Sequence, residues 1–333
     1  TNSSRQIADY ILQQYPNDDT RIAAAYAWVT ANIEYSKDSM MAINWSLGMN
    51  EKVAATLRRR KGVCDNFASL FADLLVKMNI EAVVVNGLAK AGGTTRAHSW
   101  TAVKLSNEWF LCDPTWDNGS HFAKQYFMQP PEDFIKAHWP FDPLWQLLPV
   151  PVSLQAFERG WLNMPETGIK ETVLKAVDSF MALDSLQQLK AQEERMRQIG
   201  LDQNHLRNWY AYNNMNIAII IGEQDMNHYN NAVAAANEAN ELLNKFAIFR
   251  NNAFTPTVAD NHLIQMLAPV HKLLKQAAHH VEKVSKGRAN FQYDTGELSG
   301  KIETLQKRLK TQQDFLYLYL SADTARRLQM FYQ

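Results

Sequence analysis

The hydrophobic and polar positions of this chain change their spacing twice, and each change predicts a different kind of element. Apolar residues come first at helical spacing, then in short β-branched runs of alternating polarity, and helical spacing returns through the second half. The first half has predicted helices at 5–15, 20–33, 51–60 and 64–78, and predicted strands at 81–89, 97–105 and 109–113. This order predicts an α+β domain over residues 1–165, with helices packed on an antiparallel sheet. An all-α helical bundle is predicted over residues 166–333.

The predicted helix that begins at Cys64 carries a candidate nucleophile. Its apolar positions form one buried stripe, made of Phe67, Leu70, Phe71, Leu74, Leu75 and Met78. A thiol at a helix N-terminus lies at the positive end of the backbone dipole, close to N–H groups without partners in the helix, and this favours its thiolate form. A cysteine on an apolar helix is also commonly a small buried residue with no chemical role. Whether Cys64 is a nucleophile or such a residue depends on its partners.

Two candidate partners, His98 and Asp113, lie on the predicted strands. If Leu105 pairs with Glu108 across a two-residue turn, His98 and Asp113 lie diagonally on the same face of the hairpin, within reach of each other. A turn that is one residue longer would place them on opposite faces. The sequence permits the contact without fixing it.

These three side chains predict thiol-dependent acyl chemistry. Cys64 would attack the carbonyl of a peptide or protein amide and form a thioester, while His98 would take up the thiol proton and deliver it to the leaving group. Asp113 would orient the ring of His98 and stabilise its charged form, and the backbone N–H of Cys64 is a candidate donor to the oxyanion. Hydrolysis is favoured over amine transfer, because crosslinking needs a site that excludes water and no sequence feature indicates one.

The motifs around these residues carry a resemblance to a known family. They are Gly62-Val63-Cys64, His98-Ser99-Trp100 and Asp113-Pro114-Thr115-Trp116, preceded by Ala27-Trp28-Val29, Asn32-Ile33 and Tyr35. Over roughly residues 20–150 the chain resembles the transglutaminase-core superfamily of papain-like folds, and Trp145-Gln146-Leu147-Leu148 is similar to its bacterial members. The resemblance implies a papain-like fold and a catalytic triad of Cys64, His98 and Asp113. It also leaves an alternative open, in which the domain is catalytically idle and acts as a binding or scaffold protein.

Charge, hydropathy and cysteine content limit the binding partners and the cellular location that the sequence predicts. The 34 basic and 34 acidic residues cancel, so no excess of charge argues for binding to nucleic acid or an anionic membrane. No apolar stretch has the length of a transmembrane helix, and no signal peptide is visible. The first residue, Thr1, together with the family resemblance, favours a periplasmic or secreted location after processing, with a cytoplasmic location as the alternative. The two cysteines make no disulfide framework, and Cys112 is expected to be a small buried residue.

The second half is expected to form a bundle of four or more antiparallel helices after a boundary near Pro165 and Gly168. His271, His279 and His280 lie on one predicted helix, but no cysteine or carboxylate pattern joins them. They are expected to be surface histidines, and no metal or cofactor is expected anywhere in the chain. The bundle is expected to bind another protein or to shape access to the cleft.

Overall fold

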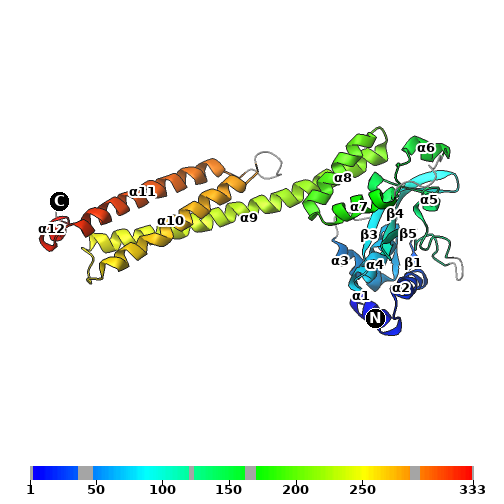
Figure 1. Cartoon of the computed structure of the whole chain (residues 1–333), viewed down its shortest axis with the longest axis horizontal. Helices are drawn as coiled ribbons and strands as arrows, with labels where there is room; N and C mark the ends of the chain where they lie inside the picture. The colour runs from blue at the N-terminus through cyan, green and yellow to red at the C-terminus, as the bar shows by residue number, and fades with distance from the viewer. Residues whose placement is uncertain (1–2, 37–47, 120–123, 162–169, 286–292, 332–333) are drawn as a thin grey trace. The chain divides into compact units, whose positions relative to one another are not determined.

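The structure is a computed structural model, and it describes residues 3–36, 48–119, 124–161, 170–285 and 293–331. The chain divides into two compact units, Thr1–Asn213 and Asn214–Gln333. Figure 1 shows the elements of each unit, and the two units are described separately below.

A four-stranded antiparallel sheet lies at the centre of the first unit, with the strand order β5-β4-β3-β6. A separate pair of short parallel strands, β1 and β2, lies beside the start of helix α4. The strands are β1 (Glu34–Tyr35), β2 (Lys61–Gly62), β3 (Ala82–Ala91), β4 (Thr94–Leu105), β5 (Glu108–Cys112) and β6 (His138–Pro140).

The four N-terminal helices bury their apolar stripes in one core together with two residues of the sheet, Val103 and Cys112. These helices are α1 (Ser4–Gln14), α2 (Asp18–Asn32), α3 (Met49–Arg59) and α4 (Cys64–Lys77). Helix α4 is the most deeply buried of them, because ten of its fourteen residues are buried. It packs against α1, α2 and α3 and against strands β3 and β4, so the element that begins at Cys64 is held from several sides.

The β4–β5 hairpin has the register that brings His98 and Asp113 to the same face. Leu105 pairs with Glu108 and Thr101 with Cys112. The two turn residues, Ser106 and Asn107, have φ angles of 50° and 64°, as a tight two-residue hairpin turn requires. The two-residue turn considered in the sequence analysis is therefore confirmed.

A second core covers the opposite face of the sheet. Trp100, Trp109 and Trp145 pack there with Val177 and Phe180 of helix α7. The elements that contribute to this core are α5 (Pro131–Phe134), the 3-10 helix η2 (Pro143–Gln146), α7 (Lys170–Met181) and α8 (Ser185–Ile199). Helix α6 (Leu154–Arg159) instead buries Phe157 in a separate cluster with Leu88 and Trp139. The proline-rich stretch from residue 130 to 151 contains α5, β6 and η2. Pro131 and Pro143 begin short helical turns, and Pro140 is tolerated because β6 is an edge strand.

An ion pair fixes α8 to this side of the sheet. Arg195 donates from Nε and from a terminal nitrogen to the two carboxylate oxygens of Asp142, each over 2.7 Å. The Asp142 side chain is 4% exposed, and the Arg195 guanidinium also lies over the Phe180 ring at 4.7 Å. The predicted boundary near residue 165 falls within residues 162–169, outside the described residues. Because α7 and α8 pack on the sheet, the first compact unit extends to Asn213.

The second unit is helical. Helix α10 runs back along α9, and α11 runs antiparallel to α10, with a shared apolar core that includes Leu243, Leu274 and Leu305. The helices are α9 (Asn204–Asn251, whose first residues belong to the first unit), α10 (Asp260–Lys283), α11 (Thr295–Ser321) and α12 (Thr324–Gln329). The prediction of an α+β part, with helices packed on an antiparallel sheet, followed by a helical part is confirmed.

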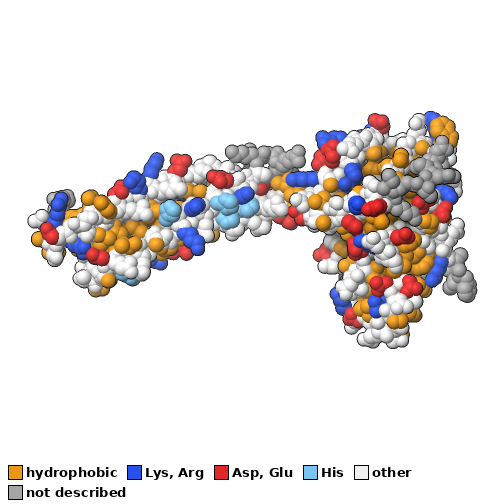
Figure 2. Space-filling view, viewed as in Figure 1, with side chains coloured by type: hydrophobic (Ala, Val, Ile, Leu, Met, Phe, Trp, Pro, Cys, Tyr) orange, Lys and Arg blue, Asp and Glu red, His pale blue; other side chains and the backbone are white. Residues whose placement is uncertain are grey.

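Acidic and basic side chains are interspersed over the visible face of each unit (Figure 2), in agreement with the zero net charge. The same view shows imidazole side chains gathered on the second unit. In the second unit, Nδ1 of His228 lies 3.0 Å from Nδ1 of His280. Within the described residues, none of the helices combines the length and the hydropathy needed to cross a membrane.

Candidate active site

The turn before α4 fixes the position of Cys64. Strand β2 pairs in parallel with β1, and the carbonyl of Gly62 accepts a hydrogen bond from the N–H of Ser36 at 2.9 Å. Asn66, in the first turn of α4, accepts a hydrogen bond from the N–H of Val63 through its Oδ1 at 3.0 Å. A Cβ atom at Gly62 would lie 2.5 Å from Cβ of Asn66, so this close approach requires glycine.

Cys64 is the first residue of α4 and is 8% exposed. The first N–H groups of a helix have no acceptor within the helix and point out from its N-terminus, where they favour negative charge. The next residue, Asp65, is buried and forms an ion pair with Nζ of Lys52 at 2.6 Å. This pair ties the start of α4 to α3, so the thiol is held on a rigid element.

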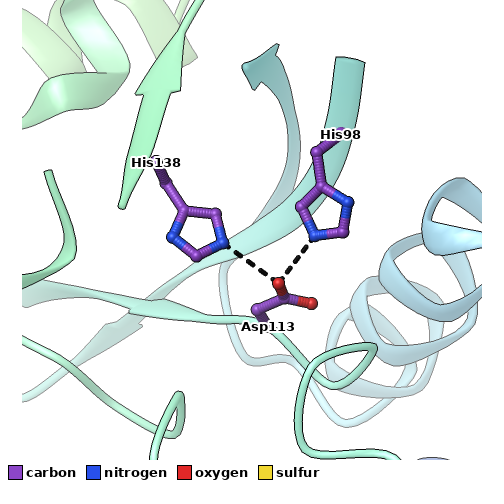
Figure 3. Close-up of side chains that lie close together, drawn as sticks. All are labelled: His98, Asp113 and His138. Carbon is purple, nitrogen blue, oxygen red and sulfur yellow. Dashed lines mark hydrogen bonds and ion pairs between the residues drawn. The ribbon is translucent and has the colours of Figure 1, made fainter. Parts of the chain in front are cut away.

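His98 and Asp113 are joined by a short hydrogen bond. Nε2 of His98 lies 2.7 Å from Oδ2 of Asp113, which follows the last residue of β5 (Figure 3). Burial by itself would lower the pKa of His98, but the Asp113 carboxylate and its hydrogen bond outweigh burial and raise that pKa to about 10. A side-chain hydrogen bond with Cys64 and the charge of its thiolate act in the same direction. Since Nε2 is engaged by Asp113, Nδ1 is the ring nitrogen that is left for a second partner.

The Asp113 carboxylate is completely buried and surrounded by donors. Its Oδ1 accepts the backbone N–H groups of Thr115 at 2.9 Å and Trp116 at 3.3 Å. Burial alone would raise the pKa of Asp113, but the charge of His98 and hydrogen bonds from two imidazoles hold it well below its ordinary value. The carboxylate is therefore ionised despite its burial.

The second imidazole belongs to His138, a residue that the sequence analysis missed. It is the first residue of β6, and its Nε2 lies 3.1 Å from the same Oδ2 of Asp113 (Figure 3). The only sequence signal was a histidine within the short, mostly apolar run His138-Trp139-Pro140-Phe141, followed by an aspartate. That signal is weak because the neighbouring prolines indicate irregular chain.

Within the described residues, one group of three side chains has ligand atoms close enough together for a metal ion. The group is His98, Asp113 and His138, whose ligand atoms all lie within 4.8 Å of one another. A tetrahedral zinc ion with bonds of about 2.0–2.1 Å keeps neighbouring ligand atoms roughly 3.3 Å apart. The 2.7 Å between His98 and Asp113 is the length of a charge-assisted hydrogen bond instead. The geometry fits a hydrogen-bond network better than a coordination shell.

The other cysteine lies away from this group of side chains. Both cysteines are free thiols, and Cys112 is buried on the opposite face of the hairpin, in the core of the N-terminal helices. The N–H of Met128 donates to its Sγ at 3.2 Å, and burial, the largest cause, raises the pKa of the Cys112 thiol to about 12. Of the two cysteines, Cys64 is the one that acts on the pKa of His98.

Comparisons with known proteins find transglutaminase-like relatives of this chain. A family model described as the transglutaminase-like superfamily matches residues 5–114. Kyphoscoliosis peptidase of Mus musculus is 30% identical over 179 residues, an alignment that covers 48% of this chain and 27% of that protein. Lim and transglutaminase domain protein ltd-1 of Caenorhabditis elegans is 30% identical over 167 residues, covering 41% of this chain and 22% of that protein. The chain thus spans about a quarter of the length of the curated relatives it matches.

Two solved structures are also similar over part of the chain. The periplasmic domain of TgpA from Pseudomonas aeruginosa is 21% identical with a TM-score of 0.29, over 37% of this chain and 46% of that one. A structure described as a TGase is 18% identical with a TM-score of 0.27, over 34% of this chain and 32% of that one. The family match spans Cys64, His98 and Asp113. The chain therefore contains a transglutaminase-like domain, matched over residues 5–114.

Proposed function

We propose that Cys64, His98 and Asp113 form a catalytic triad that cleaves peptide or protein amides through a thioester at Cys64. The observation that carries the proposal is the 2.7 Å hydrogen bond between His98 and a buried, ionised carboxylate, and Cys64 also acts to raise the pKa of His98. A base oriented by a third group, next to a nucleophile at a helix N-terminus, is the arrangement that activates a cysteine.

The reaction proceeds in two stages. The Cys64 proton passes to Nδ1 of His98, and Sγ attacks the carbonyl carbon of the substrate amide. When the C–N bond breaks, the leaving amine takes this proton from His98, and the acyl group remains on sulfur as a thioester. In hydrolysis a water molecule gives its proton to His98 and attacks the thioester, after which Sγ leaves. Asp113 keeps its charge throughout and stabilises the imidazolium of His98.

Water and an amine are both able to resolve such a thioester, and hydrolysis is the version that we favour. Its support is that kyphoscoliosis peptidase, the mammalian relative, is named as a peptidase and aligns with 48% of this chain. Amine transfer uses the same three residues. The rival proposal is a catalytically idle domain that serves as a binding or scaffold protein. We also predict that the protein is bacterial and exported, and that its helical unit binds another protein.

Trapping with electrophilic peptides tests the proposal. The protein is incubated with a library of peptidyl vinyl sulfones, and the adducts are located by mass spectrometry of peptide digests. We expect modification at Cys64 in the wild-type protein, and its loss in Cys64→Ala and in His98→Ala. The matched control, Cys112→Ala, should leave labelling of Cys64 unchanged. Labelling of wild type that is no faster than labelling of His98→Ala would favour the idle domain.

The same protein then distinguishes water from an amine. A peptide substrate found by the library is turned over in ¹⁸O-labelled water with and without a primary amine such as dansylcadaverine. Incorporation of ¹⁸O into the acyl product supports hydrolysis, whereas an acyl–dansylcadaverine product formed in preference to the acid would assign the site to amine transfer.

A further inference from the structure

We propose that His138 is a positioning residue for the reaction described above: a permanently neutral donor that holds Asp113 ionised and aimed at His98. The inference rests on the proposed function, because it assigns to His138 a role in tuning the Cys64–His98 pair. It also makes a claim about the hydrogen-bond network that is testable apart from turnover.

The first argument is the number of donors around the Asp113 carboxylate. An ionised carboxylate has about four lone-pair sites. The backbone N–H groups of Thr115 and Trp116 approach Oδ1, and Nε2 atoms of His98 and His138 approach Oδ2. Together these four donors saturate a side chain that is completely buried. Without His138, only three of these donors would remain, and one lone pair of the buried carboxylate would lose its hydrogen bond. An unsatisfied buried charge costs free energy of folding.

The second argument concerns the protonation of His138. Its side chain is wholly buried, which lowers the pKa of His138 even though Asp113 acts in the opposite direction. Its Nδ1 is buried and makes no hydrogen bond of good geometry, and the nearby carbonyl of Phe134 favours the charged ring only weakly. The neutral tautomer with its proton on Nε2 donates a hydrogen bond to Asp113. Its Nδ1 carries no proton and therefore needs no acceptor.

Aromatic side chains surround the His138 ring and exclude water from it. Phe134 stacks on it with ring centroids 4.0 Å apart, and Trp116 lies at 4.4 Å. Trp100 meets it edge-on at 5.1 Å and Tyr126 at 5.7 Å. The titratable groups around the ring are Asp113, His98 and Tyr126. Positive charge is unfavourable in such a dry site, and the His98 imidazolium at 5.6 Å adds to the cost.

The third argument is that the sheet makes a specific place for the strand that carries His138. Gly87 of β3 pairs with His98 on one side and with Pro140 on the other. A Cβ atom on Gly87 would lie 2.2 Å from the carbonyl oxygen of Trp139 and 2.5 Å from the Trp100 ring. The missing side chain lets β6 approach closely enough for His138 to share the carboxylate with His98.

This arrangement has a consequence in the step that releases the amine. When His98 gives its proton to the leaving nitrogen, Asp113 faces a neutral ring and loses its main stabilising charge. A neutral donor at His138 still stabilises the carboxylate, so the proton moves from His98 to the leaving nitrogen and not to Asp113. Asp113 therefore stays ionised, and ready to stabilise the next imidazolium, through both stages.

The test compares two substitutions that differ in the donor alone. His138→Leu fills the aromatic site without an N–H group, and His138→Gln places an amide N–H close to the position of Nε2. The readout is alkylation of Cys64 by iodoacetamide, followed by mass spectrometry between about pH 5 and pH 10. At neutral pH we expect labelling in His138→Leu to slow by roughly tenfold, the size of one lost hydrogen bond to a buried charge, with its pH profile moved upward. His138→Gln should recover most of the rate.

Several outcomes would overturn the inference. Unchanged labelling in His138→Leu would do so, and so would a His138→Gln variant as slow as His138→Leu. If neither variant folds, histidine ¹⁵N chemical shifts of the wild-type protein decide, because they must report a neutral ring protonated at Nε2 from about pH 5 to pH 9. A titrating ring, or a proton on Nδ1, would refute the proposal. Labelling of wild type no faster than of His98→Ala would instead overturn the proposed function itself.

Discussion

Replacement of Gly87 by alanine tests whether the sheet is built to admit β6. The added Cβ would lie 2.2 Å from the Trp139 carbonyl oxygen and 2.6 Å from Cα of Pro140. Ordinary contacts of this kind are about 3.3 Å or longer, so β6 has to move by roughly 1 Å. A shift of that size breaks the hydrogen bonds from Phe141 to Asn86 and from Lys90 to Ala137, which are each 2.9 Å long.

The loss of stability caused by this movement is the sum of two contributions. Overpacking of a buried site costs about 1–3 kcal/mol, and each lost backbone hydrogen bond adds about 0.5–1.5 kcal/mol. We therefore expect Gly87→Ala to lower the free energy of unfolding of the first unit by about 2–5 kcal/mol. The variant should also slow Cys64 labelling, because His138 moves away from Asp113 with β6.

Tryptophan fluorescence in a urea titration measures this effect selectively. All nine tryptophans lie in the first compact unit, so the signal reports unfolding of that unit alone. Gly48→Ala is the matched control, since Gly48 has an ordinary φ of −59° and, among the described residues, no atom lies within 4 Å of a Cβ built there. The control should cost less than about 1 kcal/mol. If Gly87→Ala is no less stable than the control, the argument from the close approach of β6 is refuted.

Three further changes test other parts of the account. Asp113→Asn should lower turnover by about tenfold to a thousandfold. The loss is smaller than in a serine triad, because a thiolate–imidazolium pair depends less on its third member. A loss below twofold would contradict the role of Asp113. Arg195→Met leaves the buried Asp142 charge without its bidentate partner, so urea unfolding of the first unit should lose about 2–4 kcal/mol, and an unchanged midpoint would contradict the ion pair. Burial, followed by the neighbouring imidazole of His228, lowers the pKa of His280 below the value of about 6.5 expected for the unfolded chain. The stability of the second unit should therefore be complete above that value and fall as the pH drops through it, and circular dichroism should show a smaller fall in His280→Gln.

The β4–β5 hairpin was predictable because its constraints are local. Polar Ser106 and Asn107 between two short apolar runs favour a two-residue turn, and that turn fixes the register of every residue after it. Once Leu105 pairs with Glu108, strand alternation places His98 and Asp113 on one face. Helix α4 was equally clear, because its apolar stripe begins immediately after the Gly62-Val63 turn.

The environment of Asp113 was not predictable from the sequence, because it depends on contacts between distant segments. His138 reaches the carboxylate only because β6 adds to the sheet beside β3, and that pairing depends on the absence of a side chain at Gly87. The C-terminal limit of the first unit was unpredictable for the same reason. Val177 and Phe180 lie on an ordinary amphipathic helix, and nothing in their spacing indicates that they pack against the tryptophans of the sheet.

The most direct test of the central claim is the rate at which iodoacetamide labels Cys64, measured against pH in wild type and in His98→Ala. The account predicts that the wild-type thiol reacts rapidly down to about pH 6, because a base whose pKa is raised to about 10 holds the thiol proton. In His98→Ala, labelling should become slow at that pH and rise only under alkaline conditions, while buried Cys112 stays protected in both proteins. Identical profiles for Cys64 in the two proteins would mean that His98 does not activate the thiol, and the proposed triad would be wrong.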